Sequence, residues 1–340
     1  MPATKTYIPY LDGWRGLAIL FLLVGHFFPV AGINLGAVGV ALFFVLSGFL
    51  MSRILFVDKV PLPIFYRRRI ARILPSVVVF LLAVTLAYLA AGREISLYEL
   101  LSAATFTNNY FVGSGPWTMP VGHIWSLSVE EHAYILLSLL ALSCRARKTS
   151  GLVELGTVAG LAASLALAYW LVFGSSRVPG LWLHTEVAAF GLLVSAFALL
   201  AFRRRPPAPP RHAATLLVML GICAYWWQSP PPLMLVGGGA AFALAINLLD
   251  RSPGPFRTML AFRPLRQLGI WSFSLYLWQQ PFYMLMHREG LPAPLALGCS
   301  LIVGVAAFYL IENPARTWLN RMTMAKAALS AENDKVPAQP

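Results

Sequence analysis

The sequence predicts an all-α, polytopic integral membrane protein with about ten transmembrane helices and both termini cytoplasmic. Of the 340 residues, 58% are hydrophobic and only 11% are charged, and the mean hydropathy is +0.69. The apolar residues gather in stretches near the roughly 20 residues that a membrane-spanning helix needs. Lys and Arg gather in the connections between alternate stretches, which is typical of the cytoplasmic side of a membrane.

Ten apolar stretches are candidate spans. They cover residues 14–31, 37–57, 74–91, 124–143, 152–173, 181–202, 213–228, 233–249, 268–286 and 294–312. The first resembles a secretory signal, but its apolar stretch is long and a second span follows closely, so we expect it to be retained. Asp12, just before this span, is expected to cap its helix.

The distribution of charge predicts the orientation. With the N-terminus inside, most of the 26 Lys and Arg fall in cytoplasmic segments, and the other side receives Arg93, Arg177 and Arg288. This asymmetry places both termini inside, as expected for a multi-pass protein of the cell inner (plasma) membrane. It also accounts for the net charge of +13 without a nucleic-acid partner.

Residues 1–319 are expected to form one membrane domain, and residues 320–340 a disordered cytoplasmic tail, because the tail is polar and charged. The outer connection at residues 92–123 is expected to be a partly ordered cover. The three cysteines have no paired spacing, and the sequence predicts neither a disulfide framework nor a metal site.

The first candidate span carries two ionisable residues, Arg15 and His26. Eleven positions make three helical turns, so both side chains share a face and are separated by roughly 16 Å along the axis. Ionisable residues inside a bilayer are costly and usually mark function.

The second motif, FYRRRIARILP at residues 65–75, places Arg69 and Arg72 at i and i+3 on one face. Guanidinium groups match phosphate geometry. Arg15 lies on the same side of the membrane and could form a joint anion site with Arg69 and Arg72. This interpretation and the alternative, a topogenic anchor that contacts anionic lipid, are equally favoured.

The third motif, HIWSLSVEEHAY at residues 123–134, places Ser126, Glu130 and Tyr134 on one helix face. Glu130 reaches a depth similar to that of His26, so we expect it to orient His26 as a general base. The alternatives are a buried structural pair, or Glu130 bonded to backbone or to a tyrosine.

Two weaker motifs complete the candidate site. Ser47 in LFFVLSGFL is favoured as a small packing residue over a catalytic one. SFSLYLWQQP at residues 272–281 places Tyr276 and Gln279 near one face of a span. The expected cavity-lining residues are Ser47, Ser126, Tyr134, Tyr276 and Gln279.

These motifs, together with PYLDGWRGLAIL and IENPAR, occur in an order and spacing that resembles the acyltransferase 3 family of integral-membrane acyltransferases from about Tyr7 to Trp318. The resemblance implies about ten membrane helices and transfer of an acyl group, often acetyl from acetyl-CoA, to hydroxyls of extracytoplasmic glycans, lipid-linked sugars or antibiotics. Arg15 and His26 match the family's essential arginine and histidine. Arg69 and Arg72 match the paired arginines proposed to engage the donor.

The chain departs from the family pattern in two places. The family often has histidine where this chain has Gln279, so this position is given no acid or base role. Some members carry a C-terminal esterase domain of the SGNH type, and nothing resembling one follows Trp318.

The sequence thus predicts an O-acyltransferase with acyl-CoA as cosubstrate and no bound cofactor, a hydroxyl-bearing acceptor and surrounding membrane lipid. Arg15, Arg69 and Arg72 would bind the donor phosphates, and His26 with Glu130 would be catalytic. Direct transfer and an acyl-histidine relay both remain open. The alternatives are a secondary transporter or flippase with an intramembrane polar site, and a non-catalytic membrane subunit.

Overall fold

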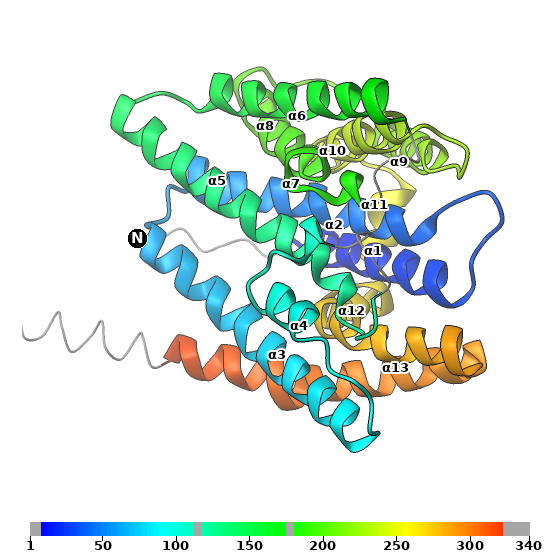
Figure 1. Cartoon of the computed structure of the whole chain (residues 1–340). Helices are drawn as coiled ribbons and strands as arrows, with labels where there is room; N and C mark the ends of the chain where they lie inside the picture. The colour runs from blue at the N-terminus through cyan, green and yellow to red at the C-terminus, as the bar shows by residue number, and fades with distance from the viewer. Residues whose placement is uncertain (1–7, 112–116, 175–179, 322–340) are drawn as a thin grey trace, which may run out of the picture.

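The computed structural model describes residues 8–111, 117–174 and 180–321 (Figure 1). Within these ranges the chain is helical, and the β pairing recorded there is one isolated bridge between Ile33 and Trp226. The all-α prediction is therefore confirmed for the described residues. Arg177 and nearly all of the expected tail at residues 320–340 lie outside them.

The helices follow the apolar pattern of the sequence. They are α1 (Pro9–Phe27), α2 (Leu35–Ser52), α3 (Leu62–Ala90), α4 (Leu97–Ala104), α5 (Trp125–Arg147), α6 (Leu152–Phe173), α7 (Thr185–Ala188), α8 (Phe190–Arg204), α9 (Ala213–Ala224), α10 (Gly239–Leu248), α11 (Pro255–Leu260), α12 (Arg263–Glu289) and α13 (Ala293–Ala307). π-helical turns at Arg53–Val57, Leu233–Gly238 and Phe308–Glu312 continue α2, lead into α10 and continue α13.

Each of the ten predicted stretches overlaps one of these helices or a pair of them in sequence. Among the described residues, 6 helical segments are long and apolar enough to cross a membrane. They are Leu35–Val57, Leu62–Ala90, Gly122–Arg147, Leu152–Phe173, Thr185–Arg204 and Ala293–Arg321. A multi-pass membrane protein is thus supported, whereas the count of ten spans and the cytoplasmic termini stay predictions.

The first helix begins earlier than its apolar stretch. Pro9 lies in the first turn of α1, where its missing N–H costs no hydrogen bond, and Ile8 precedes it without a side-chain cap. The expected capping role of Asp12 is therefore wrong. Asp12 lies inside the first turn, where its Oδ1 accepts from Arg15 Nη1 at 3.0 Å.

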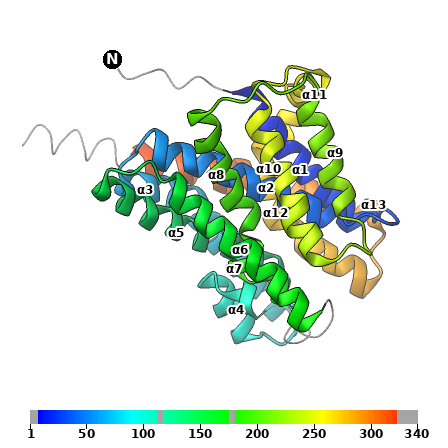
Figure 2. The same cartoon turned by 90° about the horizontal axis from the view of Figure 1, so that it is seen from above.

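The centre of the molecule is formed by α1 and α2, with α3, α12 and α13 on one side and α6, α8, α9 and α10 on the other (Figures 1 and 2). Glycines let these helices approach closely. A Cβ added at Gly16 would lie 1.8 Å from the carbonyl oxygen of Leu265, and one at Gly48 would lie 2.0 Å from that of Leu192. Small residues at such contacts are the usual means of helix association in membranes.

The described parts of the outer connection are tied down at both ends. The carboxylate of Glu99 on α4 accepts three hydrogen bonds of 2.8 Å, from the backbone N–H and hydroxyl of Thr118 and the N–H of Met119. Arg288 at the end of α12 donates to the carbonyls of Trp117 and Thr118. Residues 112–116 of the expected cover lie outside the described part.

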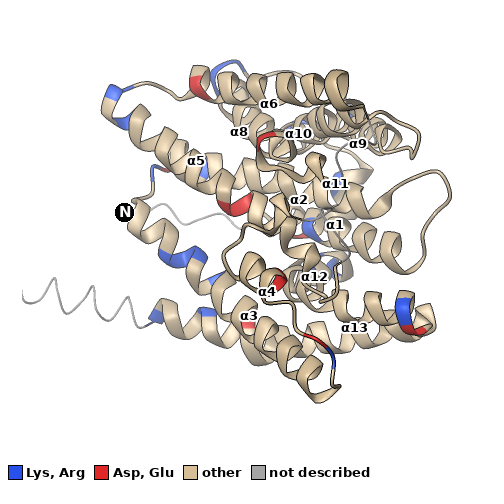
Figure 3. Ribbon diagram, in the orientation of Figure 1, with Lys and Arg blue, Asp and Glu red and all other residues tan. Residues whose placement is uncertain are grey.

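Figure 3 shows clusters of Lys and Arg where α3 begins and where α5 ends. We call this side of the molecule the basic face. The helices α1 and α12 start at the basic face and run towards the opposite face. The helix α5 runs in the other direction and ends at the basic face. Arg15, Arg69 and Arg72 therefore lie in the half of the molecule nearer the basic face, and His26 lies near the opposite face.

Candidate active site

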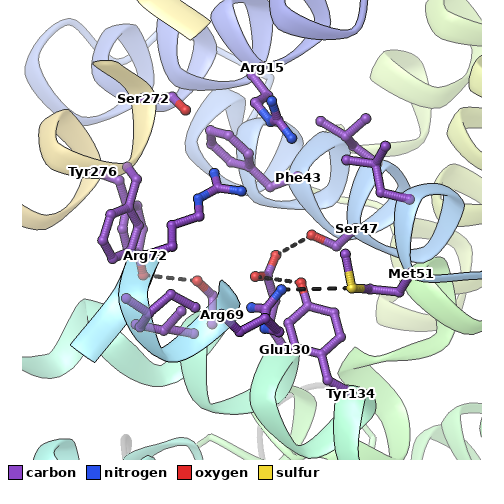
Figure 4. Close-up of a pocket in the computed structure, with 16 residues that line it drawn as sticks. Arg15, Phe43, Ser47, Met51, Arg69, Arg72, Glu130, Tyr134, Ser272 and Tyr276 are labelled. Atoms are coloured by element: carbon purple, nitrogen blue, oxygen red, sulfur yellow. Dashed lines mark hydrogen bonds between the residues drawn. The ribbon is translucent and has the colours of Figure 1, made fainter. Parts of the chain in front are cut away.

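A cavity of about 90 Å³, the central cavity, lies between α1, α2, α3, α5 and α12 (Figure 4). Its polar and charged lining residues are Arg15, Ser47, Arg69, Arg72, Ser126, Glu130, Tyr134, Ser272 and Tyr276. All of the sequence-predicted site residues except His26 and Gln279 thus line one cavity. Three consecutive helices, α1 to α3, and the more distant α5 and α12 bring them together.

Two of the three arginines are held by carboxylates. Arg69 Nη2 donates to Glu131 Oε1 at 2.8 Å, and its guanidinium lies 3.5 Å from the centroid of the Tyr134 ring. Arg15 is paired with Asp12. Both side chains are therefore fixed in position and still bring positive charge to the wall of the cavity.

Arg72 differs from these two. Within the described part of the chain it forms no recorded hydrogen bond or ion pair, and its guanidinium extends into the cavity towards Arg15 (Figure 4). The charges that act on it are those of Arg15, Arg69 and the buried Glu312. Its donors are available to a ligand, and a guanidinium in a water-poor site favours a phosphate or carboxylate.

Glu130 is engaged by its neighbours in the cavity. Its carboxylate accepts from Ser47 Oγ at 2.7 Å and from Tyr134 OH at 2.9 Å. The expectation that Glu130 orients His26 is therefore wrong, and the tyrosine-bonded alternative describes the structure. Equal depth in the membrane does not fix the direction in which a side chain points around its helix, and His26 faces α12 instead of α5.

His26 is oriented by Gln279. Its Nδ1 lies 2.9 Å from Gln279 Oε1, and the buried amide of Gln279 donates from Nε2 to Gln280 Oε1 at 3.1 Å. The amide oxygen therefore faces the imidazole and accepts from Nδ1–H, which leaves a lone pair on Nε2. The ring also packs on Tyr283, with centroids 4.7 Å apart. A neutral amide thus fixes the tautomer that a general base needs.

Tyr276 is the cavity-lining residue of α12 that lies nearest in sequence to Gln279, the partner of His26. Ser126 Oγ and the Tyr276 hydroxyl lie 2.8 Å apart, and this hydroxyl also donates to the carbonyl of His123. Gln279 follows Tyr276 by about one turn of α12. His26, bonded to Gln279, therefore lies about one helical turn from the cavity lining, towards the opposite face.

Sequence reasoning missed three polar neighbours of the site. Glu131 holds Arg69, Glu312 accepts from Ser274 Oγ at 2.6 Å, and His123 Nε2 donates to the Leu277 carbonyl at 3.1 Å. Only Glu312, a carboxylate within an apolar stretch, gave a recognisable signal. The others depend on which helix packs alongside. Among the described residues no group of three or more His, Cys, Asp or Glu could hold a metal ion.

Comparisons with known proteins found a family model and several curated relatives that match this chain. A family model described as an acyltransferase domain matches residues 8–313. A Staphylococcus aureus (strain COL) protein provisionally named an O-acetyltransferase is 30% identical over 169 residues, which is 44% of this chain and 28% of the relative. O-acetyltransferase OatA of Staphylococcus aureus (strain NCTC 8325 / PS 47) is 29% identical over 150 residues, 39% of this chain and 24% of that protein.

The matched segment thus spans a minor part of the length of these curated relatives. No solved structure matches the chain significantly. The family model nevertheless covers nearly all of the described helices, including every residue that lines the central cavity. The chain therefore belongs to the acyltransferase 3 family.

Proposed function

We propose that the protein is a membrane O-acyltransferase that moves an acyl group, acetyl in the first instance, from acyl-CoA to a hydroxyl of a glycan, lipid-linked sugar or related acceptor. The observation that carries this proposal is an arginine-lined cavity among membrane helices, with Arg72 uncommitted and the oriented His26 about one helical turn from its lining. The names of the O-acetyltransferase relatives support an acetyl donor and a hydroxyl acceptor.

The donor would enter from the basic face. Its phosphates would bind Arg72 and the N–H groups of the Arg15 guanidinium that do not face Asp12. Arg69, held by Glu131, would contribute positive charge from a fixed position. The pantetheine arm would extend along α1 towards His26, across a rise of roughly 16 Å. Tyr276 and Ser126 line the cavity and are hydrogen-bonded to each other, and this hydrogen bond would open when the thioester reaches His26.

The transfer step would use the lone pair on His26 Nε2. This nitrogen would accept the proton of the acceptor hydroxyl as its oxygen attacks the thioester carbonyl. The carbon–sulfur bond would then break, and the proton would pass to the departing thiolate to give free CoA. Gln279 would keep the ring in the required tautomer, and an acyl-histidine relay would use the same nitrogen.

The test uses full-length protein in nanodiscs, acetyl-CoA and glycan fragments prepared from the envelope of the host cell. We expect acceptor-dependent release of CoA from wild type. His26→Ala should lower kcat by about 10²–10⁴-fold, the range for loss of a general base. His212→Ala, which alters an exposed histidine outside the central cavity, is the matched control and should match wild type.

Alkali-released acetate from the envelope glycans of cells that carry each variant provides a second readout. Normal turnover by a folded His26→Ala variant would remove this residue from the mechanism. Movement of a glycan across the membrane by the wild type without any release of CoA would instead favour the transporter alternative.

A further inference from the structure

A second cavity, of about 590 Å³, opens at the basic face between the π-helical turn Arg53–Val57 and the helices α5, α6 and α8. Among the described residues it shares no lining residue with the central cavity. Its charged lining residues are Lys59, Arg145, Lys148, Arg203 and Arg204, and the described lining contains no Asp or Glu. We call it the basic cavity. Its volume lies within the range of about 300–1,000 Å³ typical of ligand pockets.

The basic cavity lies at the depth of lipid headgroups. Four membrane-length helical segments have an end at its wall: Leu35–Val57, Gly122–Arg147, Leu152–Phe173 and Thr185–Arg204. Where apolar spans end, the hydrocarbon core gives way to the headgroup region. A ligand in this cavity would therefore sit level with the phosphates of the surrounding leaflet.

The lining is amphipathic. Besides the cations, the wall includes the apolar side chains Leu55, Ala141, Leu152 and Leu200. On the adjoining turns of α5 and α6, Leu142 is 45% exposed and Val153 is 76% exposed, so an exposed apolar surface adjoins the cavity. The cavity thus combines a cationic rim with a route for acyl chains.

The walls of the cavity are fixed by specific contacts. Arg145 Nη2 donates to the carbonyls of Leu55 at 2.8 Å and Val60 at 3.1 Å, which ties the end of α5 to the connection after α2. Gly151, at a φ of +79°, allows the Phe56 ring to pack so closely that an added Cβ would lie 2.6 Å from it. The cavity is therefore a product of packing between two connections.

The exposed cations that line the basic cavity, which we call the rim cations, are Lys59, Lys148, Arg203 and Arg204. Within the described residues, Lys59, Lys148, Arg203 and Arg204 take part in no recorded ion pair. Glu154, on the first turn of α6, is already engaged, 3.4 Å from Arg147 and 2.9 Å from Thr149 Oγ1. The rim therefore keeps a positive potential that favours an anion.

We propose that the basic cavity binds the phosphate headgroup of an anionic phospholipid. The phosphate lies against Arg203, Arg204 and Lys148, and the acyl chains leave along the apolar surfaces of α5 and α6. A free phosphate or a nucleotide phosphate offers the same anionic chemistry. The apolar wall and the headgroup depth favour a lipid, and basic pockets between spans on the cytoplasmic side are a recurrent form of lipid site.

The experiment compares two double variants of the full chain. Arg203→Gln with Arg204→Gln removes two rim cations. The matched control, Arg205→Gln with Arg211→Gln, removes equal charge from the same connection outside the cavity. Purified proteins are mixed with equal amounts of phosphatidylglycerol and phosphatidylcholine in detergent, and bound lipid is counted by native mass spectrometry. Wild type and control should bind more phosphatidylglycerol than phosphatidylcholine. In the rim variant, the ratio of bound phosphatidylglycerol to bound phosphatidylcholine should be at least tenfold lower.

Competition distinguishes the possible sources of the phosphate. If millimolar inorganic phosphate or CoA displaces phosphatidylglycerol from wild type, the cavity serves a soluble anion and the lipid assignment is overturned. Equal loss in both double variants would also overturn it, because diffuse charge would then explain retention. No readout depends on acyl transfer, so these results stand apart from the proposed function.

Thermal unfolding shows whether the rim variant has a folding defect. Phosphatidylglycerol should raise the melting temperature of wild type and control, and should not raise that of the rim variant. If the rim variant fails to fold, Lys148→Asn carries the test. This change removes one rim cation, and asparagine tolerates the φ of +58° at this position. Unchanged retention of phosphatidylglycerol by a folded Lys148→Asn protein would then exclude this rim cation from the site and contradict the proposal.

Discussion

At the scale of single residues, the site contains two kinds of polar contact with different roles. Glu130, Ser47 and Tyr134 bond to one another and stabilise the wall of the central cavity. Gln279 bonds to His26 and fixes the direction of the imidazole. An amide cannot balance the charge of an imidazolium as a carboxylate would. The contribution of Gln279 is therefore expected to be positional.

Gln279→Leu removes the acceptor for His26 Nδ1–H while keeping a side chain of similar size. The lost hydrogen bond, about 1 kcal/mol, should lower kcat roughly 5–10-fold and leave the KM for acyl-CoA unchanged. Gln279→Glu keeps an acceptor at this position and should restore most of the activity. Steady-state kinetics would check both, with Gln267→Leu on the same helix as the control. A Gln279→Leu enzyme with wild-type kcat would contradict the positioning role.

Arg72→Gln tests the donor site with little effect on the fold, because Arg72 has no recorded ion pair among the described residues. A hydrogen bond to a charged group is worth about 1.5–3 kcal/mol, so the KM for acyl-CoA should rise roughly 10–100-fold. Arg68→Gln, which alters an exposed neighbour outside the cavity, is the control. The phosphate assignment fails if isothermal titration with CoA gives equal affinities for the two variants.

At the scale of elements, the hydrophobic stretches predicted the existence of the helices better than their ends. Residues 74–91 were expected to form a span, yet α3 begins at Leu62, and α12 begins at Arg263 instead of 268. Hydropathy ends at the first charged residues, whereas a helix continues through the headgroup region because its backbone hydrogen bonds are local. Arg69 and Arg72 therefore lie on a long helix rather than on a connection.

The contact between α1 and α12 depends on backbone proximity. A Cβ at Gly269 would lie 1.8 Å from the carbonyl oxygen of Asp12, and no side-chain movement can relieve that clash. Gly269→Ala should therefore destabilise the protein by at least about 1–3 kcal/mol, visible as a lower melting temperature in detergent. Gly298→Ala, which meets nothing within 4 Å, should leave it unchanged. Equal melting of the two variants would mean that the helices are not so closely packed.

At the scale of the whole molecule, the sequence predicted the residues that line the central cavity, with the exception of Gln279, but not how they pair. Helical spacing placed Arg69 with Arg72, and Ser126 with Glu130 and Tyr134, because these relations lie within one helix. The partners of His26 and Arg69 come from other helices, at 253 and 62 positions along the chain. Periodicity cannot give the rotation of one helix relative to another, so these pairs needed the structure.

The orientation of the whole molecule decides whether the donor can reach its arginines, since acyl-CoA is a cytoplasmic compound in the proposed reaction. Glu94 and Arg205 are exposed residues that the charge pattern places on opposite sides of the membrane. In a background with Cys223 and Cys299 replaced by alanine, Glu94→Cys should react with an impermeant maleimide in spheroplasts, and Arg205→Cys only after lysis. The buried Cys144 can remain. The reverse labelling pattern would put the basic face outside, where no acyl-CoA is available, and would overturn the donor route.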